Sequence, residues 1–513
     1  MFQTLLTLGH LLPAAAERYG YKTALACGEA TFSFNELNQR AIRLARALRA
    51  LGIQRGDRVT LYSHNCWEWI VSYYGVARIG AVLNPINIML TGDEVRYITS
   101  DCGAKAIIAP AEKAALLLAV KKDTPLETIV LYGDSAPAGT LAFGALLAES
   151  EAGTGDDVPI EAGPDDLSTI MYTSGTTGHP KGAMLTHRNL SLNGALTATM
   201  HVRTSADTTV TALPLCHVYG SAVLNGTIVS GGTLVLLERF NEVAALRAIE
   251  QNHATMFEGV PTMFMLILNS PEFDKHDLLS LTRCTVGGQT MPLAKMQAVE
   301  ERFRCPLLEL WGMTEVAGLG TTHSMYAPNR LGSIGVPLPG VECRIADPAN
   351  PSAALPSGEV GELMVRGPIV MRGYYGNEAG TRETIEPDGW LHTGDLAHMD
   401  ADGYVFIADR KKDLIITGGY NVYPAEIERV VAMHPAVAMV AVGGQPDPVR
   451  GEVAKAYVVL KHGASADEAS IITFCREHLA AYKAPRAIQF VPDLPKTSTG
   501  KILRRQLKTL DGH

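Results

Sequence analysis

The chain opens with an amphipathic pattern of helical period that changes, after a glycine, into a short run of apolar residues. Between positions 31 and 59, apolar side chains recur every three or four residues, at Leu37, Ala41, Leu44, Ala45, Leu48 and Leu51. This spacing predicts a helix that ends at Gly52 and is followed by a strand from Val59. Three further pairs of the same kind follow, with helices predicted at 67–80, 92–102 and 112–121, each before a short apolar strand. Such alternation is typical of an α/β sheet.

The rest of the chain divides into regions of different character. Residues 134–167 are rich in Ala, Gly, Asp and Pro and are interpreted as a surface connection, after which the alternation resumes and continues to about residue 346. Residues 355–409 contain short strands and turns, which indicates an antiparallel, barrel-like β unit. A charged junction, RKKD at 410–413, precedes a last hundred residues with enough strands and helices for a small α+β domain. At roughly 150 residues per domain, the chain is expected to form two or three units.

Composition and charge exclude several classes of protein. The chain has 513 residues, 47% hydrophobic and 19% charged, which describes a globular protein with a large core rather than a disordered or fibrous one. Its 44 Lys and Arg against 53 Asp and Glu give a net charge of −9, so the basic footprint of a nucleic-acid-binding protein is missing. No stretch approaches 18 apolar residues and the first cation is Arg18, so neither an integral membrane segment nor a signal peptide is expected. Eight scattered cysteines without a CxxC pair are typical of a reduced, cytoplasmic protein.

The C-terminal tail carries the opposite charge to the chain as a whole. Between 481 and 513 seven cations stand against Asp493 and Asp511, a local charge of +5. The cations are Lys483, Arg486, Lys496, Lys501, Arg504, Arg505 and Lys508. A polyanion held by this domain and a solvated charged face explain the asymmetry equally well.

A short apolar strand leads directly into a loop rich in glycine and hydroxyl groups. Residues 168–182 read STIMYTSGTTGHPKG. Three glycines allow backbone N–H groups to converge on an anion, hydroxyls add donors, and Lys181 adds a charge. The loop is not a Walker A motif, because His179 and Pro180 separate glycine from lysine and Gly182 follows where Ser or Thr is needed. The order of ten residues favours a phosphate-binding loop over a flexible turn.

Eight motifs, in register along nearly the whole chain, resemble the adenylate-forming superfamily of acyl-CoA synthetases, luciferases and adenylation domains. They are GAVLNPIN (80–87), YTSGTTGHPKGAMLTH (172–187), LPLCHVYG (213–220), GGQTMP (287–292), ELWGMTE (309–315), GWLHTGD (389–395), DRKKDLIITGGYNVYPAEIE (409–428) and PKTSTGKILRR (495–505). Within the superfamily the chain is most similar to bacterial fatty-acyl and aryl CoA ligases. The resemblance implies an α/β fold with a large N-terminal domain that includes the small β unit (1–409), a hinge (410–413) and a small mobile α+β C-terminal domain (414–513).

The implied reaction has two steps. A small-molecule carboxylic acid and ATP give acyl-AMP and pyrophosphate, and acyl-AMP then reacts with coenzyme A to give acyl-CoA and AMP. The first step requires stabilisation of charge at the α-phosphate more than it requires a protein nucleophile. The resemblance therefore implies ATP, Mg²⁺ and CoA as cofactors or co-substrates, and a monomer or a homodimer.

The resemblance assigns catalytic roles to four residues. Lys501 is expected to stabilise the adenylation transition state, and Thr314 to contact the α-phosphate. Glu315 is expected to hold Mg²⁺, which needs only one or two carboxylates beside phosphate oxygens. His217 is expected near the reacting carboxylate or the CoA channel, although a lone histidine beside apolar residues is usually a satisfied core side chain. Cys216 has no activating partner in the sequence, so no cysteine nucleophile is expected.

The remaining site residues are expected to bind the nucleotide and CoA. The loop is expected to hold the β- and γ-phosphates through Thr173, Ser174, Gly175, Thr176, Thr177, Gly178 and Lys181. Trp311 stands where the family commonly has Tyr; it is expected to stack on adenine, without the phenol's hydrogen bond. Asp395 is expected to accept both ribose hydroxyls, with Arg410 at the ribose or phosphate. Three consecutive residues either let the backbone approach the adenine edge or form a plain strand end: Gly287, Gly288 and Gln289.

The C-terminal domain carries two features of the second step. Lys412 stands at the family's hinge position. Gly418 and Gly419 lie on a segment that is expected to close on the pantetheine channel after adenylation. Several aryl ligases and luciferases have a lysine where Gly418 stands, so no second catalytic lysine is expected there.

Three segments are expected to line the acyl pocket, by resemblance: 217–226, 257–262 and 316–319. They are largely apolar, and Glu258 is their one charge. An amino-acid substrate would need a buried Asp and a dicarboxylate a buried cation, neither of which is present, and Glu258 would repel a second carboxylate. A medium- or long-chain fatty acid is therefore favoured. The alternatives are a 4-coumarate- or ferulate-type aryl CoA ligase and a module that loads acyl-AMP onto a carrier protein.

Overall fold

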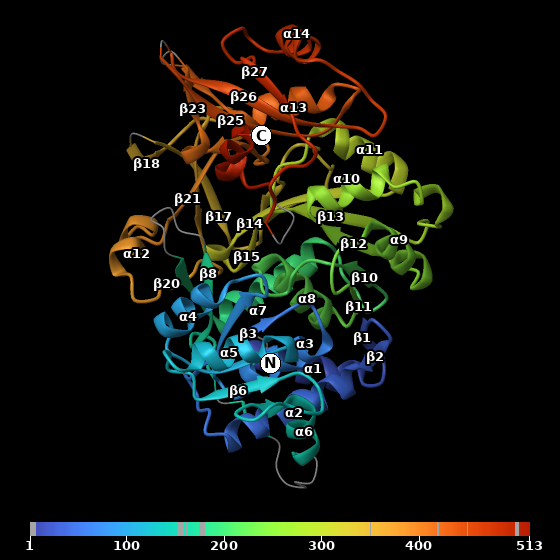
Figure 1. The fold of residues 1–513 in the computed structure, drawn as a ribbon, viewed down its shortest axis with the longest axis vertical. Coiled ribbons are helices and arrows are strands. Elements are labelled where there is room, and N and C mark those ends of the chain that lie inside the picture. The colour runs from blue at the N-terminus through green and yellow to red at the C-terminus, as the bar shows by residue number, and fades with distance from the viewer. Residues whose placement is uncertain are drawn as a thin grey trace.

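The computed structural model describes residues 7–150, 158–160, 162–173, 180–348, 350–417, 420–448, 450–497 and 502–512. Figure 1 shows a large body of sheets and helices formed by the N-terminal part of the chain, and a smaller unit, orange to red, at one end of it. In the part of the chain that the structure describes, no helix combines the length and apolarity needed to cross a bilayer.

The first sheet carries the start and end of the expected phosphate loop. Its described strands run in the order β20-β9-β8-β4-β3-β5-β6-β7. Strands β8 to β7 are parallel, whereas β9 and β20 are antiparallel to their neighbours. The bounds are β3 Arg58–Ser63, β4 Val82–Asn87, β5 Ala104–Ala109, β6 Thr128–Leu131, β7 Leu141–Ala142, β8 Leu167–Thr173, β9 Lys181–Thr186 and β20 Gly373–Tyr374.

The second sheet has, among the described residues, the order β16-β15-β14-β13-β12-β10-β11-β1-β2. It is parallel from β14 to β1 and antiparallel at both ends. The bounds are β1 Thr23–Cys27, β2 Ala30–Ser33, β10 Thr208–Thr211, β11 Thr233–Leu236, β12 Met256–Gly259, β13 Arg283–Gly287, β14 Leu307–Met313, β15 Gly318–Thr322 and β16 Val336–Pro337. The carboxyl ends of parallel strands are where open α/β sheets bind ligands.

Helices cover and connect these two sheets. The helices of the large body are α1 Leu8–Tyr19, α2 Phe34–Ala50, α3 Trp67–Arg78, α4 Gly92–Asp101, α5 Ala114–Lys121, α6 Phe143–Glu149, α7 His187–Met200, α8 Val218–Ser230, α9 Glu242–Gln251, α10 Pro261–Asn269, α11 Leu293–Phe303 and α12 Glu378–Thr384. Helix α7 contacts β8 and β9 of the first sheet and β15 of the second. It crosses α8 closely at two glycines, because a Cβ on Gly194 would lie 2.9 Å from the Cβ of Asn225, beside Gly226.

Two smaller sheets complete the chain, one that is antiparallel and a second within the C-terminal unit. An antiparallel sheet has the order β18-β17-β19-β21-β22 among the described strands: β17 Glu342–Asp347, β18 Asn350–Ala354, β19 Gly361–Arg366, β21 Leu391–Met399 and β22 Val405–Arg410. The short 3₁₀ turn η5, Lys411–Asp413, then leads into the C-terminal unit. That unit contains β23 Ile415–Thr417, β24 Tyr420–Val422, α13 Pro424–Met433, β25 Val437–Asp447, β26 Gly451–Leu460, α14 Glu468–His478, β27 Ala487–Phe490 and the 3₁₀ segment η6 Arg504–Gly512.

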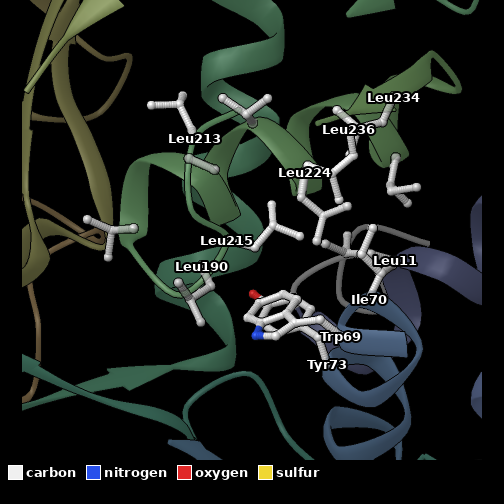
Figure 2. Packing of buried hydrophobic residues seen from close by; sticks show 14 of the residues in the cluster. Leu11, Trp69, Ile70, Tyr73, Leu190, Leu213, Leu215, Leu224, Leu234 and Leu236 are labelled. Carbon is white, nitrogen blue, oxygen red and sulfur yellow. The ribbon is translucent and has the colours of Figure 1, made fainter. Parts of the chain in front are cut away.

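The main core lies where α3 meets α7, α8 and the second sheet. Figure 2 shows the rings of Trp69 and Tyr73 next to leucines of these elements. The two rings stack with centroids 5.1 Å apart and planes 17° apart. Leu190 of α7 and Leu224 of α8 are at most 2% exposed in the same cluster. The closely packed core fixes the helices whose ends reach the site.

Most expected elements are present, and one expectation is wrong. The first predicted helix is α2, which ends before Gly52 and is followed by β3. The predicted surface connection 134–167 instead contains β7 and α6. Phe143, Leu146 and Leu147 of α6 are buried. Their spacing of three and four residues is a helical signal that the surrounding Ala, Gly and Pro composition concealed.

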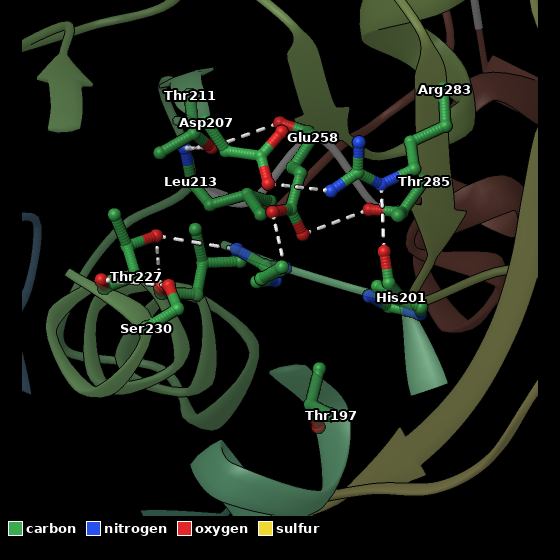
Figure 3. A network of polar contacts seen from close by, with 12 residues as sticks. Thr197, His201, Asp207, Thr211, Leu213, Thr227, Ser230, Glu258, Arg283 and Thr285 are labelled. Carbon is green, nitrogen blue, oxygen red and sulfur yellow. Dashed lines mark hydrogen bonds and ion pairs between the residues drawn. The ribbon is translucent and has the colours of Figure 1, made fainter. Parts of the chain in front are cut away.

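A buried ion pair joins β12 to the turn after α7 (Figure 3). The side chains of Glu258 and Arg203 are at most 1% exposed and contact each other directly. Thr285 of β13 donates to Glu258 at 2.8 Å, and Arg203 donates to Thr227 of α8 at 3.2 Å. Removing one partner would leave a buried charge without compensation, which costs more than the pair itself contributes.

Replacement of Arg203 by methionine tests this pair. We expect Arg203→Met to destabilise the protein by roughly 3 kcal/mol, because Glu258 then stays buried and unpaired. The double variant Arg203→Met with Glu258→Gln should lose less, since Gln is neutral and still accepts from Thr285. Thermal unfolding followed by circular dichroism measures both.

The exposed pair of Arg382 and Glu378 provides the control. Arg382→Met should leave the melting temperature unchanged within error. A double variant less stable than Arg203→Met would show that charge compensation is not the cause.

Candidate active site

The ends of β8 and β9 bracket the expected phosphate loop. Thr173 and Lys181 are partners in the antiparallel ladder, and the Thr173 hydroxyl donates to the Lys181 carbonyl at 3.4 Å. The Lys181 ammonium lies 5.1 Å from the ring centroid of Tyr374, which gives a cation–π contact. Ser174, Gly175, Thr176, Thr177 and Gly178 lie outside the described residues.

A cavity of about 440 Å³ opens at this hairpin and brings four of the expected site residues together. Thr173, Lys181, Glu315 and Arg410 line it with Tyr374. Its lining also includes Lys411, Lys412, Glu362 and Glu383. Cations, carboxylates and hydroxyls around a volume of this size suit a phosphate group with a counter-ion.

Glu315 is the buried carboxylate of this cavity. It lies in the 3₁₀ turn Thr314–Val316 that follows β14, with Thr314 directly before it. Its side chain accepts from the Tyr374 hydroxyl at 2.8 Å. Burial raises the pKa of Glu315, while the Tyr374 hydrogen bond, Arg410 and Lys181 act in the opposite direction.

The donor set fits Mg²⁺ only with help from a substrate. The described residues contain no group of three His, Cys, Asp or Glu side chains arranged to hold a metal ion. Mg²⁺ is usually bound by one or two carboxylates together with phosphate oxygens and water. Glu315, at the wall of a cavity lined by Lys181, therefore fits an ion that arrives with phosphate.

Asp395 connects the second sheet to the antiparallel sheet. It lies in β21 and is 5% exposed. The indole N–H of Trp311, in β14, donates to one carboxylate oxygen at 2.7 Å, and the Nε of Arg410 is 3.1 Å from the other. The expectation for Trp311 was stacking without the family's phenol hydrogen bond. The structure shows that its indole supplies a hydrogen bond of its own.

The glycines before α11 have a packing role that the sequence left open. A Cβ on Gly287 would lie 2.2 Å from a methyl carbon of Leu310 in the adjacent strand β14, and Gly288 has a φ of +87°. Glycine is thus needed here to form the strand end, whether or not a nucleotide lies against it. Gln289 follows, and its amide is 3.4 Å from the carbonyl oxygen of Ile502.

The last contact brings the C-terminal tail to the site. Lys501 lies outside the described residues, as do Gly418 and Gly419. Ile502, the residue after Lys501, contacts Gln289. The end of the chain therefore reaches the large body next to the strand that leads to Gly288.

His217 and Cys216 lie before α8. His217 is the residue that precedes α8, and its Nε2 is 3.3 Å from the amide nitrogen of Asn87, at the end of β4. Burial raises the pKa of the Cys216 thiol to about 12. The thiol is therefore protonated at neutral pH, in line with the expectation of no cysteine nucleophile.

The three segments expected at the acid converge, but their charge differs from the expectation. Segments 316–319 and 217–226 meet where a Cβ on Gly318 would lie 3.3 Å from Ala222 of α8. Segments 217–226 and 257–262 are linked through Thr285 of β13. Its hydroxyl is 2.9 Å from that of Tyr219 and donates to Glu258. Glu258 is not a lone charge, because Arg203 from outside these segments pairs with it. The expected repulsion of a second carboxylate by Glu258 is therefore wrong.

Sequence reasoning missed Glu309. It lies in β14 two residues before Trp311, so the two side chains leave the same face of the strand. Burial raises the pKa of Glu309 to about 8, against the smaller effects of the Met291 N–H and Arg429. Among the described residues its Oε2 has no hydrogen-bond partner. The signal was an acidic residue inside the otherwise apolar run LLELW.

Family models match both parts of the chain. The AMP-binding enzyme model matches residues 12–375, and the model of the AMP-binding enzyme C-terminal domain matches residues 426–501. The chain belongs to the AMP-binding enzyme family. The resemblance to adenylate-forming enzymes is thereby confirmed.

Relatives of known function match this AMP-binding enzyme along almost its whole length. A long-chain-fatty-acid–CoA ligase of Bacillus subtilis (strain 168) is 35% identical over 98% of this chain and 94% of its own. A feruloyl-CoA synthase of an Amycolatopsis species is 36% identical over 95% of this chain and 96% of its own. The crystal structure of an anthranilate CoA ligase with anthranoyl-AMP has a TM-score of 0.91 at 30% identity, covering 99% of this chain and 97% of its own. The expected fold and the expected class, an AMP-forming acyl-CoA synthetase, are confirmed.

The Trp311–Asp395 hydrogen bond makes a prediction for AMP binding. Trp311→Phe keeps an aromatic ring but removes the donor, so Asp395 loses the indole N–H that orients one of its oxygens. We expect the dissociation constant for AMP, measured by calorimetry, to rise about tenfold. Trp311→Tyr, which restores a hydroxyl donor, should bind more tightly than Trp311→Phe; equal affinities would show that only stacking matters.

The raised pKa of Glu309 predicts that the free energy of unfolding depends on pH. The pKa of Glu309 is about 8 in the folded protein, against an ordinary value of 4.5 in the unfolded chain. As the pH rises between these values, the unfolded chain loses a proton that the folded protein keeps. The free energy of unfolding must therefore fall across this window. Glu309→Gln carries no charge at any pH, so its melting temperature should depend less on pH between pH 5 and pH 8 than that of wild type. At pH 8 the variant should be more stable than wild type by ~1 kcal/mol or more.

Glu301→Gln, on the exposed face of α11, is the matched control. The pH dependence of its melting temperature should be parallel to that of wild type. A Glu309→Gln profile that is also parallel would contradict the assignment.

Proposed function

We propose that the protein is a carboxylate–CoA ligase. The carboxylate of the acid attacks the α-phosphate of ATP, which gives acyl-AMP and releases pyrophosphate. The thiol of coenzyme A then attacks the acyl carbon, which gives the thioester and releases AMP. The single observation that carries this proposal is the cavity in which Lys181, Glu315 and Arg410 meet next to the Trp311–Asp395 pair.

Each described residue has a task in the first step that its position supports. Lys181 and Thr173 bind the terminal phosphates at the ends of the phosphate loop. Asp395 accepts from the ribose hydroxyls, as a carboxylate can with its two oxygens. Mg²⁺, when bound with the nucleotide by Glu315, neutralises charge on the phosphates.

Two further roles fall on residues beside the acid. Thr314 contacts the α-phosphate from the turn that carries Glu315. His217 faces the reacting carboxylate or the channel for CoA. Neither role requires a protein nucleophile, because the acyl carbon is activated by AMP as the leaving group.

The C-terminal unit serves both steps in turn. Lys501 stabilises the negative charge that develops at the α-phosphate during adenylation. The contact between Ile502 and Gln289 supports such a position for the tail. For the second step the unit rotates about 410–413, and the Gly418–Gly419 segment closes on the pantetheine channel.

The substrate we favour is a medium- or long-chain fatty acid. The segments at the acid site are mainly apolar, and Arg203 neutralises Glu258, so an apolar tail meets no unpaired charge. The relatives are divided, since a long-chain-fatty-acid–CoA ligase and a feruloyl-CoA synthase are almost equally similar. An aryl acid is the second candidate, because the Tyr219 hydroxyl lies in these segments, 2.9 Å from the hydroxyl of Thr285 in β13, and suits an acid with a polar ring substituent.

The test is the rate of AMP formation on a panel of acids, with and without free CoA. Octanoate to palmitate should give higher kcat/KM than malonate, succinate or amino acids, because each buried methylene is worth up to ~0.8 kcal/mol. Glu315→Gln, with its fold verified by circular dichroism, is the inactive control.

The other outcomes separate the alternatives. A preference for ferulate or coumarate over every fatty acid would replace the fatty-acid proposal with an aryl CoA ligase. Acyl-AMP that accumulates despite free CoA would contradict a CoA ligase and favour a module that loads a carrier protein.

A further inference from the structure

Arg504 lies at the centre of a partly buried cluster of three carboxylates. Its Nε and Nη2 bind the two oxygens of Glu428 in α13, at 3.2 and 2.7 Å. Its Nη1 lies 2.9 Å from Asp409 and 3.4 Å from Asp413. The three nitrogens of one guanidinium are thus all engaged, a geometry that a lysine cannot reproduce. We call these four residues the Arg504 cluster.

The cluster spans the connection between the two parts of the chain. Asp409 belongs to β22 of the antiparallel sheet, and Asp413 ends the turn η5 that leads into the C-terminal unit. Glu428 lies within that unit. One side chain therefore binds carboxylates on both sides of residues 410–412.

Asp409 strengthens this link. Its side chain is 1% exposed, and its Oδ2 accepts from the backbone N–H of Ala425 at 2.7 Å, in the first turn of α13. A carboxylate at a helix N-terminus is stabilised by the unpaired N–H groups there. The end of β22 thus binds both the start of α13 and the tail of the chain.

The tail segment that Arg504 fixes is short. Arg504 follows Lys501 by three residues, and Ile502 between them contacts Gln289 of the large body. The contacts of Ile502 and Arg504 both lie within three residues on the C-terminal side of Lys501, and they hold residues 502–504 between the large body and the Arg504 carboxylates.

We propose that Arg504 is a positioning residue for acyl-AMP formation, which holds the Lys501-bearing tail in place by binding carboxylates on both sides of the 410–412 connection. This inference rests on the ligase function proposed above. Because Asp409 belongs to the large body, its contacts with Arg504 and Ala425 must break or rearrange when the C-terminal unit rotates for the second step. The cluster therefore favours the arrangement of the first step.

The first experiment does not depend on activity. Residues 410–412 read Arg-Lys-Lys and are exposed, so trypsin cleaves there when the connection opens. Brief digestion of the full chain, followed by intact mass, gives the cleavage rate. We expect Arg504→Met to be cut about tenfold faster than wild type, since cleavage follows the population of the open form. Arg504→Lys should be intermediate.

Lys508→Met is the matched control, because it removes a charge from the same 3₁₀ segment at an exposed position outside the cluster. It should be cut at the wild-type rate. Asp409→Asn is the second variant if Arg504→Met does not fold, because it leaves the Glu428 contact in place. It should also be cut faster than wild type.

The second experiment measures the two half-reactions separately. In Arg504→Met, acyl-AMP formation should fall about tenfold, whereas thioester formation from supplied acyl-AMP and CoA should change less than about twofold. Equal loss in both steps, or cleavage of Arg504→Met at the wild-type rate, would overturn the proposal. Faster cleavage in a protein that makes no thioester with any acid would instead contradict the ligase function while leaving the positioning role of Arg504 intact.

Discussion

The site depends on one carboxylate, Asp395, that is held from two directions. Trp311 donates to it from the second sheet, and Arg410 approaches it from the last residue of the antiparallel sheet. A buried, charge-assisted hydrogen bond has a defined length and direction, which it adds to the apolar packing between the sheets. The Trp311–Asp395 contact therefore fixes the position of the antiparallel sheet, and with it the 410–412 connection, relative to β14.

A second contact of the same kind lies in the wall of the cavity. The hydroxyl of Tyr374, in the first sheet, donates to Glu315, which follows β14. Strand β14 and the turn after it thus bind one partner in the first sheet and one in the antiparallel sheet. The cavity lies where these three sheets meet, which explains why the residues that line it are far apart in the sequence.

Much of the fold was predictable from the sequence, because long amphipathic or apolar segments such as α2 and β3 carry their own signal. Helix α6 was missed because its three buried residues are embedded in Ala, Gly and Pro. The site was predicted through motifs, and Thr173, Lys181, Glu315 and Arg410 do line one cavity. What the sequence could not reveal is pairing. Nothing near Glu258 in the chain points to Arg203, 55 positions earlier, as its partner.

The charge of the C-terminal tail illustrates the same limit. Counted along the sequence, its +5 is compatible with a surface that holds a polyanion. In the structure, Lys483 pairs with Glu426, Lys496 with Asp493, and Arg504 with the three carboxylates of its cluster. A cation that is already paired and partly buried attracts a distant phosphate only weakly. If the tail acts on a nucleotide, it acts through the position of Lys501 rather than through its summed charge, and that position depends on the acidic residues that surround Arg504.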